Sequence, residues 1–145
     1  MPMPHSIDVN DYMVKNPVLA TPDTELFAAI QQITSQRVSG VTVIDEDRHP
    51  VGMLSELDCL RAILSGAYYG DRVGTMRIAN HMSKNVECVP AHASLVDVAQ
   101  SMLAHKRRRR PVVNDRNEVI GQITCRAILR CVTDFDVPGQ WFDVT

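Results

Sequence analysis

The sequence lacks long apolar runs. No apolar run approaches the roughly 18 residues needed to span a bilayer, and the first residues hold no apolar stretch like that of a signal peptide. A formal net charge of −2 on 145 residues gives no reason to expect nucleic acid or an anionic membrane as a partner. We therefore expect a soluble, cytoplasmic protein.

Patterns typical of enzymes and metal sites are also missing. The five histidines are scattered, with no His-x-x-x-His pair, and there is no nucleophile elbow. The four cysteines form no Cys-x-x-Cys pair and lie in apolar stretches, which favours reduced packing residues over disulfides or a zinc site. We predict a non-catalytic protein with no metal site and no required cofactor.

What the sequence does contain is an internal duplication. Three pairs of residues share a separation of 69 positions: Gly52 and Gly121, Met13 and Met82, Leu26 and Leu95. Residues 12–64 align on residues 81–133 without a gap, with few identities but with the classes of residue in step. At 145 residues, the chain is long enough for a shared core that buries roughly two-thirds of its unfolded surface.

The pattern of apolar and turn residues predicts the same order of elements in both repeats: strand, helix, strand, strand, helix. In the first repeat the strands are expected at residues 18–21, 41–45 and 50–55, with helices carrying the stripe Leu26, Ala29, Ile30 and Ile33 and covering residues 56–65. In the second repeat the strands are expected at residues 87–90, 111–114 and 118–124, with helices carrying the stripe Leu95, Val98, Ala99 and Met102 and ending near residue 132. Gly66 is expected to stop the last helix of the first repeat, before a loop over residues 65–74 and a short helix at residues 78–82.

These elements predict an α+β fold class. Each repeat would have a small sheet with helices on one face, and packing the two repeats together would bury the open faces. The predicted organisation is a first repeat with its N-terminal segment at residues 1–66, a linker at 67–76, a second repeat at 77–133 and a tail at 134–145. The tail holds Trp141, which either caps a hydrophobic edge or lies in a dimer contact.

The segment Gly52-x-x-Ser55-x-x-Asp58 allows two interpretations. A strand that ends at Ser55 and leads into a helix leaves unpaired N–H groups and the positive end of the helix dipole, which together favour a phosphate. The Asp58 carboxylate can accept from the paired hydroxyls of a ribose, and Gly52 leaves room for a ligand or a neighbouring backbone. In the other interpretation, Ser55 and Asp58 form a capping box that satisfies only the helix's own donors.

The duplicated set of motifs resembles a tandem pair of cystathionine β-synthase (CBS) domains, here as a stand-alone module. The segments that carry the resemblance are Ser39-Gly40-Val41-Thr42-Val43-Ile44-Asp45, Arg108-Arg109-Arg110-Pro111-Val112-Val113-Asn114, and the Gly-x-x-Ser/Thr end of each third strand, which Asp58 completes in the first repeat. The resemblance covers residues 8–133 and implies two repeats packed about a pseudo-two-fold axis. In this setting the interpretation of Asp58 as a ligand-binding residue outweighs capping alone.

The resemblance also implies the roles of individual residues in binding an adenosine ligand. Asp58 would hold the ribose, with Ser55 and Thr124 in the phosphate region and Arg108 and Arg109 at the phosphate charge. The wall of the adenine pocket would be formed by Ala20, Thr21, Ser39, Gly40 and Val41. Ala127 stands where the second repeat would carry its acid, so we expect one competent site and a second that is weak, altered or vacant.

The basic run at residues 106–110 has two further interpretations. Pro111 favours an extended Arg110, so successive side chains should alternate in direction and only some can reach one cleft. The run can instead be a solvated edge that keeps the sheet soluble, or a nucleic-acid contact, although it has no neighbouring aromatic residues.

The function implied by the resemblance is regulatory sensing of an adenosine-containing ligand, in the manner of an energy sensor. AMP, ADP or ATP stand ahead of S-adenosylmethionine or NAD. The expected partners are a second copy of the chain, in a homodimer, and an unidentified protein target. The alternatives are a ligand-free dimeric scaffold and a nucleic-acid-binding regulator.

Overall fold

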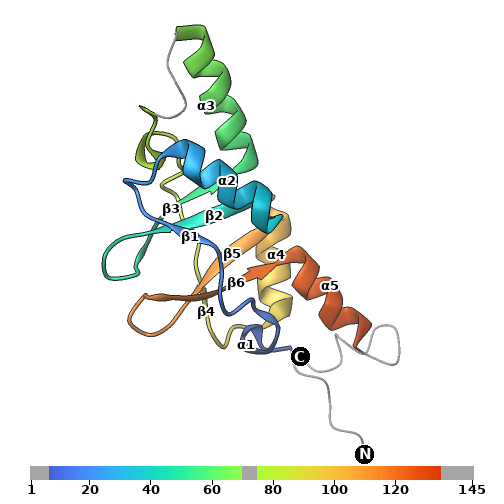
Figure 1. Cartoon of the computed structure of the whole chain (residues 1–145). Helices are drawn as coiled ribbons and strands as arrows, with labels where there is room; N and C mark the ends of the chain where they lie inside the picture. The colour runs from blue at the N-terminus through green and yellow to red at the C-terminus, as the bar shows by residue number, and fades with distance from the viewer. Residues whose placement is uncertain (1–6, 70–74, 135–145) are drawn as a thin grey trace, which may run out of the picture. The chain divides into compact units, whose positions relative to one another are not determined.

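The computed structural model describes residues 7–69 and 75–134. The chain divides into two compact units, one formed by Pro17–Val86 and the other by Met1–Asn16 together with Glu87–Thr145. Within the described ranges each unit holds one three-stranded sheet and helices (Figure 1). The predicted α+β fold class and the predicted order of elements are confirmed.

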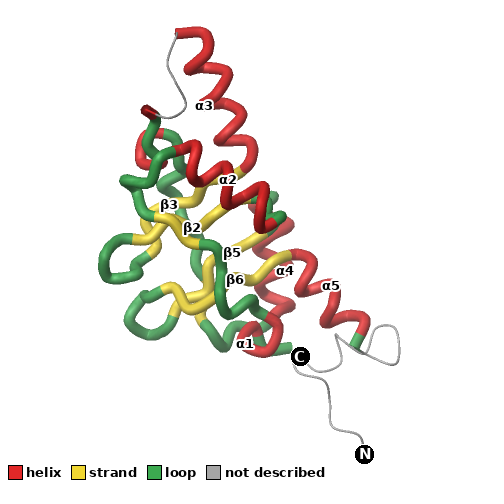
Figure 2. The backbone as a smooth tube through the Cα atoms, viewed as in Figure 1, coloured by secondary structure: helices red, strands yellow, loops and turns green. Residues whose placement is uncertain are grey.

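The unit formed by Pro17–Val86 contains the elements of the first repeat. They are β1 (Leu19–Ala20), α2 (Leu26–Gln36), β2 (Gly40–Ile44), β3 (Pro50–Ser55), α3 (Glu56–Tyr69) and the 3-10 helix η2 (Ile78–Asn80). Strand β1 pairs parallel to β2, and β2 pairs antiparallel to β3 (Figure 2). The helix α2 buries Leu26, Ala29 and Ile33, the apolar stripe predicted from the sequence, because residues three and four apart share one face of a helix.

The second unit repeats this arrangement. Its elements are α1 (Val9–Tyr12), β4 (Val89–Pro90), α4 (Leu95–His105), β5 (Arg109–Val113), β6 (Val119–Thr124) and α5 (Cys125–Thr133). Strand β4 pairs parallel to β5, and β5 pairs antiparallel to β6 (Figure 2). The sheet orders are therefore the same in both units.

The duplication also extends to unusual backbone conformations. The helices α2 and α4 both end in left-handed residues, Arg37 at φ 55° and Lys106 at φ 54°. The two hairpin turns hold Arg48 at φ 64° and Asn117 at φ 61°. Both pairs obey the spacing of 69 residues, so the two repeats fold alike even where the residue types differ.

Each unit has its own hydrophobic core. In the first unit Leu26, Leu54 and Ile78 are fully buried, and in the second Val9, Leu95 and Ile123 are. Burying a side chain of this size contributes roughly 1.5–3 kcal/mol relative to leaving it exposed. These cores fix the strand ends at which the candidate site residues lie.

The opening segment of each repeat packs on the sheet of the other repeat. Val14 exchanges backbone hydrogen bonds with Gln122 at 2.8 and 2.9 Å, and Met53 exchanges two bonds with Ser83 at 2.9 Å. Residues 7–16 therefore complete the second unit, and residues 75–86 complete the first. The compact units and the sequence repeats divide the chain at different points.

Two predicted details of the joining region differ in the structure. The helix α3 runs through Gly66 to Tyr69 instead of stopping at the glycine, since a lone glycine costs a helix only about 1 kcal/mol relative to alanine. The predicted short helix at 78–82 is one 3-10 turn, Ile78–Asn80. The rest of the predicted loop, at 70–74, and Trp141 lie outside the described residues.

No helix in the described part of the chain combines the length and the apolar character needed to cross a membrane.

Candidate functional site

Ser55 and Asp58 form a reciprocal cap at the start of α3. The backbone N–H of Ser55 donates to Asp58 Oδ2 at 2.9 Å, and the backbone N–H of Asp58 donates to Ser55 Oγ at 3.1 Å. The strand β3 ends at Ser55 and α3 begins at the next residue, as the motif predicts. The two residues therefore make both hydrogen bonds of a capping box, and a ligand role has to coexist with them.

The second carboxylate oxygen of Asp58 contacts Arg61. Arg61 Nη1 donates to Asp58 Oδ1 at 3.0 Å, and the side chains of Arg61 and Asp58 are 73% and 16% exposed. An ion pair with such an exposed arginine contributes little and opens easily. Each carboxylate oxygen also has two lone pairs, so Asp58 keeps the capacity to accept from a ligand hydroxyl.

The start of β2 lies beside this cap. Gly40 pairs with Ser55 across the two strands, and the backbone N–H of Glu56 donates to the carbonyl of Ser39 at 3.0 Å. Next to them lies an open groove of about 410 Å³. The groove is lined by Ile33, Thr34, Arg37, Val38, Ser39 and Glu56.

The other residues predicted to form the wall of the adenine pocket do not all lie at the cap of α3. Val41 is fully buried in the core of the first unit. Ala20 pairs with Val43, three residues further along β2 than Gly40, which corresponds to about 10 Å along a strand. Thr21 is exposed, and its backbone N–H donates to Thr24 Oγ1 at 3.2 Å. The structure therefore brings Ser39 and Gly40 to the cap of α3, while Ala20 and Thr21 lie towards the other end of β2.

The second repeat keeps the cap but not the acid. Thr124 Oγ1 accepts from the backbone N–H of Ala127 at 3.1 Å, the same bond that Ser55 makes to Asp58. Ala127 is fully buried in the core of the second unit. A carboxylate at this position would lose its hydration, which gives a physical reason for the loss of the acid.

The basic run divides by burial, but not by simple alternation. Lys106, Arg107 and Arg108 are exposed, whereas Arg109 and Arg110 are 8% and 3% exposed. Arg109 pairs with Thr124 across β5 and β6, and the carbonyl of Arg108 accepts from the backbone N–H of Cys125 at 2.9 Å. Arg108 and Arg109 therefore lie at the cap of α5, beside Thr124.

Arg110 has a structural role that the sequence did not reveal. Its guanidinium forms an ion pair with Glu87 and donates to the carbonyl and the hydroxyl of Ser101 at 3.2 and 3.0 Å. The hydrogen bond from Arg110 holds the pKa of Glu87 below its usual value, with His105 adding to the effect. Glu87 lies 23 residues away from Arg110 in the sequence. No sequence pattern pointed to this pair.

Gly52 and Gly121 make room for methionines. A Cβ on Gly52 would overlap the sulfur of Met82 and lie 3.0 Å from the carbonyl oxygen of Ser83. A Cβ on Gly121 would lie 2.7 Å from the sulfur of Met13. Of the two reasons for Gly52 that the sequence offered, a neighbouring chain segment is the one observed.

The cysteines fit a packing role. None of the four forms a disulfide, and Cys59 and Cys131 are buried. Burial raises the pKa of the Cys59 and Cys88 thiols, and a thiol that stays protonated is a poor nucleophile.

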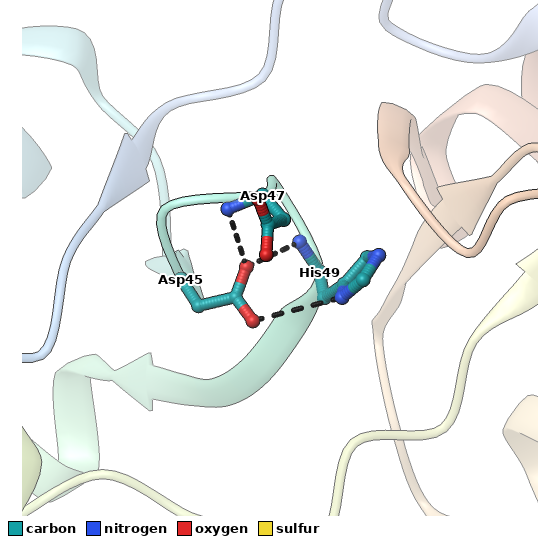
Figure 3. A group of neighbouring side chains, drawn as sticks. All are labelled: Asp45, Asp47 and His49. Carbon is teal, nitrogen blue, oxygen red and sulfur yellow. Dashed lines mark hydrogen bonds and ion pairs between the residues drawn. The ribbon is translucent and has the colours of Figure 1, made fainter.

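Asp45, Asp47 and His49 gather at the turn between β2 and β3 (Figure 3). Their ligand atoms all lie within 4.8 Å of one another, and Asp45 Oδ1 accepts from the backbone N–H groups of Asp47 and His49, both at 2.9 Å. Asn114 makes the same two bonds in the second repeat, to the backbone of residues 116 and 118 at 2.9 and 3.0 Å. Since an asparagine builds the same turn, turn formation accounts for this cluster.

Comparison with known proteins identifies the same two repeats that the structure shows. The CBS domain model matches residues 9–65 and 77–134. Inosine-5'-monophosphate dehydrogenase from Methanocaldococcus jannaschii is 28% identical over 121 residues, which are 83% of this chain and 23% of that protein. The chain therefore spans less than a quarter of the length of this curated relative.

Two solved structures have a similar fold over most of the chain. CBSX2, a CBS-pair protein from Arabidopsis thaliana solved in complex with AMP, is 25% identical with a TM-score of 0.77, covering 89% of this chain and 98% of that one. The CBS domain pair of protein MJ0100, in complex with 5-methylthioadenosine and S-adenosyl-L-methionine, is 22% identical with a TM-score of 0.78, covering 90% and 98%. With a family model matched twice and the fold repeated in both units, the chain belongs to the CBS domain family and carries two copies of the domain.

Proposed function

We propose that this chain is a regulatory, non-catalytic module that binds an adenosine-containing ligand, with AMP, ADP or ATP ahead of S-adenosylmethionine and NAD. The observation that carries the proposal is the Asp58 carboxylate, which is 16% exposed at the N-terminus of α3, where Ser39 and Glu56 line a groove of about 410 Å³. The complexes of CBSX2 with AMP and of the MJ0100 pair with S-adenosyl-L-methionine support adenosine as the common part of the ligand.

In this proposal each group has a chemical task. Asp58 accepts from the ribose hydroxyls, and Ser55, at the N-terminus of α3, contacts the phosphate region. In the second repeat Thr124 takes the corresponding place, and Arg108 and Arg109 supply positive charge for the phosphates. For the adenine we propose a wall formed by Ser39 and Gly40 at the cap of α3. Ala20, Thr21 and the backbone of Val41, whose side chain is fully buried, would extend this wall along β2. Ala127 leaves the second repeat without an acceptor for a ribose.

Binding would be converted into a signal by a change in conformation. A ligand shifts an equilibrium between two arrangements only by its differential affinity for them. We propose that these arrangements involve the repeats or a homodimer, and that a separate cytoplasmic protein receives the output.

Thermal unfolding tests the proposal. The purified chain is unfolded with AMP, ADP, ATP, S-adenosylmethionine or NAD, and a ligand at a hundred times its Kd should add about 2.7 kcal/mol, or several degrees in Tm. Asp58→Ala should abolish the shift. Asp58→Asn, which keeps an oxygen for the cap, should weaken the shift with a smaller loss of stability.

A matched control separates binding from capping. Ser94 caps α4, in the other compact unit, by accepting from the backbone N–H of Val96 at 3.2 Å. Ser94→Ala should lower stability by about 1 kcal/mol and leave the ligand shift intact. A shift that survives in Asp58→Ala would reject the assignment of the ribose to this carboxylate.

The second candidate function is a ligand-free scaffold, which the capping geometry of Ser55 and Asp58 favours. In a scaffold, no adenosine ligand changes the Tm of the folded chain, and Asp58→Ala alters stability alone. Nucleic-acid binding is a weaker third candidate, because among residues 106–110 only Lys106, Arg107 and Arg108 are exposed.

A further inference from the structure

Four exposed cations gather where α4 ends and α5 begins, in the unit that holds the strands of the second repeat. They are Lys106, Arg107, Arg126 and Arg130, and together they form what we call the basic face. The helices α4 and α5 contact each other (Figure 1). The Cys125 thiol, at the start of α5, contacts the sulfur of Met102 at 3.6 Å and the carbonyl oxygen of Arg107 at 3.9 Å. The two stretches of chain that carry the basic face are therefore neighbours.

No acid neutralises the basic face within the described part of the chain. None of its four residues forms an ion pair there, whereas Arg61, Arg77 and Arg110 are each paired with an acid. Glu87 lies near Arg107, but the carboxylate of Glu87 is already bound by Arg110. Residues 103–110 and 123–133 contain no aspartate or glutamate. The basic face is thus a concentration of positive charge on a chain whose formal net charge is −2.

The basic face is unfavourable for the stability of the chain alone. Arg126 lies in the first turn of α5, which holds no acid, although the positive end of the helix dipole favours acids there. Arg130 follows four residues later, and like charges at this spacing on a helix repel each other. The residues of the first repeat at the spacing of 69 are Arg37, Val38, Leu57 and Arg61, so the fold does not require four cations. A bound anionic partner would relieve both repulsions.

Apolar side chains beside the basic face favour a protein over a nucleic acid as this partner. On α5, Leu129 is 65% exposed and Val132 is 45% exposed, and arginine next to exposed apolar residues is typical of protein interfaces. A nucleic acid would be held through its phosphates and through bases stacked on aromatic rings. Residues 103–110 and 123–133 contain no Phe, Tyr or Trp. The chemistry therefore fits an acidic protein segment that also carries apolar side chains.

From these observations we infer that the basic face docks an acidic, apolar segment of a partner protein. Carboxylates of the segment pair with Arg126 and Arg130, and its apolar side chains cover Leu129 and Val132. The inference rests on the proposed function in one respect, that a separate protein receives the output. It needs no nucleotide, because no residue of the basic face is assigned to the ligand.

Fluorescence anisotropy with three labelled probes tests the docking. The probes are an amphipathic peptide of glutamate and leucine, polyglutamate, and oligouridylate, matched in their number of negative charges. We expect the full chain to bind the amphipathic peptide about tenfold more tightly than either other probe, because only this peptide supplies apolar side chains as well as charge.

Substitutions locate the binding on the basic face. Arg126→Glu should weaken binding of the amphipathic peptide about tenfold and leave the Tm unchanged or raised, because an acid in the first turn suits the helix dipole. Leu129→Ser should weaken binding of the amphipathic peptide but not of polyglutamate. Arg116→Glu is the matched control, since it makes the same change of charge at an exposed turn of the same unit. It should leave binding within about twofold of wild type.

Three results would overturn the inference: tighter binding of oligouridylate than of the amphipathic peptide, an equal loss in Arg116→Glu, or no binding of the peptide to wild type. Sedimentation equilibrium tests for self-association, and a different mass for Arg126→Glu than for wild type would assign the basic face to a second copy instead. Thermal unfolding with the nucleotides is measured on the same variants. Loss of docking in Arg126→Glu with an unchanged nucleotide shift separates this inference from the proposed ligand site.

Discussion

The sulfur of Met13 lies 2.7 Å from the point that a Cβ on Gly121 would occupy, and the carbonyl oxygen of Val14 lies 2.8 Å from the same point. Met82 stands in the same relation to Gly52, with both pairs related by the spacing of 69 residues. The opening segment of each repeat therefore closes on the glycine of the other repeat. The glycine that both repeats share is therefore needed for the close packing of a methionine and its neighbouring backbone.

Gly121→Ala should destabilise the protein. The added methyl would meet a backbone oxygen as well as Met13, and overpacking of this kind costs about 1–3 kcal/mol. Denaturant unfolding measures the loss. Gly52→Ala should also lose stability, and adding Met82→Ala should recover part of that loss, because the methionine side chain makes the closest contact there. Adding Met13→Ala to Gly121→Ala should recover less, because the carbonyl oxygen of Val14 still meets the added methyl. Unchanged stability in Gly121→Ala would contradict the packing account.

Ser55→Ala should destabilise the protein by removing a helix cap. The lost acceptor leaves the backbone N–H of Asp58 without its 3.1 Å bond, at a cost of about 1 kcal/mol. Thr124→Ala should cost a similar amount in the second repeat, where the corresponding bond is also 3.1 Å. Ser55→Thr, which keeps the hydroxyl, is the control for urea unfolding. A loss in Ser55→Thr as large as in Ser55→Ala would mean that the hydroxyl is not what matters.

The sequence predicted the parts of the fold that depend on local pattern. The stripe from Leu26 to Ile33 and the helix starts after Ser55 and Thr124 follow from spacing and capping, which need no distant partner. The CBS resemblance supplied the family. It was the duplication that placed Asp58 and Ala127 at equivalent positions and showed that one repeat lacks the acid.

What the sequence did not predict depends on contacts between distant residues. The partner of Arg110 is Glu87, 23 residues away, and the opening segments exchange partners, so that Val14 pairs with Gln122. Consecutive residues of β5 are buried, which requires cover on both faces of the strand, and the sequence did not predict that cover. The stop predicted at Gly66 failed since the helix continues to Tyr69.

Arg110→Met should destabilise the protein much more than Arg108→Ala. Arg110 is 3% exposed and bonds to Glu87 and Ser101, so its removal should cost up to about 3 kcal/mol. This value is at the low end for a broken buried ion pair, because the carboxylate of Glu87 keeps access to water. Arg108 is exposed, and Arg108→Ala should change stability by less than about 0.5 kcal/mol. Equal effects of the two changes on the free energy of unfolding would contradict the structural role of Arg110.

Tyr12→Phe should loosen α1 from the end of α5. The Tyr12 hydroxyl donates to Asp134 Oδ2 at 2.8 Å, a bond worth about 0.5–1.5 kcal/mol. Burial and this bond raise the pKa of Tyr12, so its contribution to stability is complete below the ordinary tyrosine pKa of about 10 and falls as the pH rises above it. Thermal unfolding between neutral and alkaline pH should show wild type losing its advantage over Tyr12→Phe. A constant difference would contradict the bond.

Glu87 should make stability depend on acid pH. Its pKa is lowered in the folded protein by the hydrogen bond from Arg110, so its contribution is complete above the ordinary glutamate pKa of about 4.3 and disappears as the pH falls through the lower folded value. Wild type should therefore exceed Glu87→Gln in Tm at neutral pH, and the difference should shrink on acidification. Glu46→Gln, at an exposed turn position, is the matched control and should show no such trend. A difference that stays constant down to strongly acid pH would mean that the Glu87 charge does not contribute to the bond with Arg110.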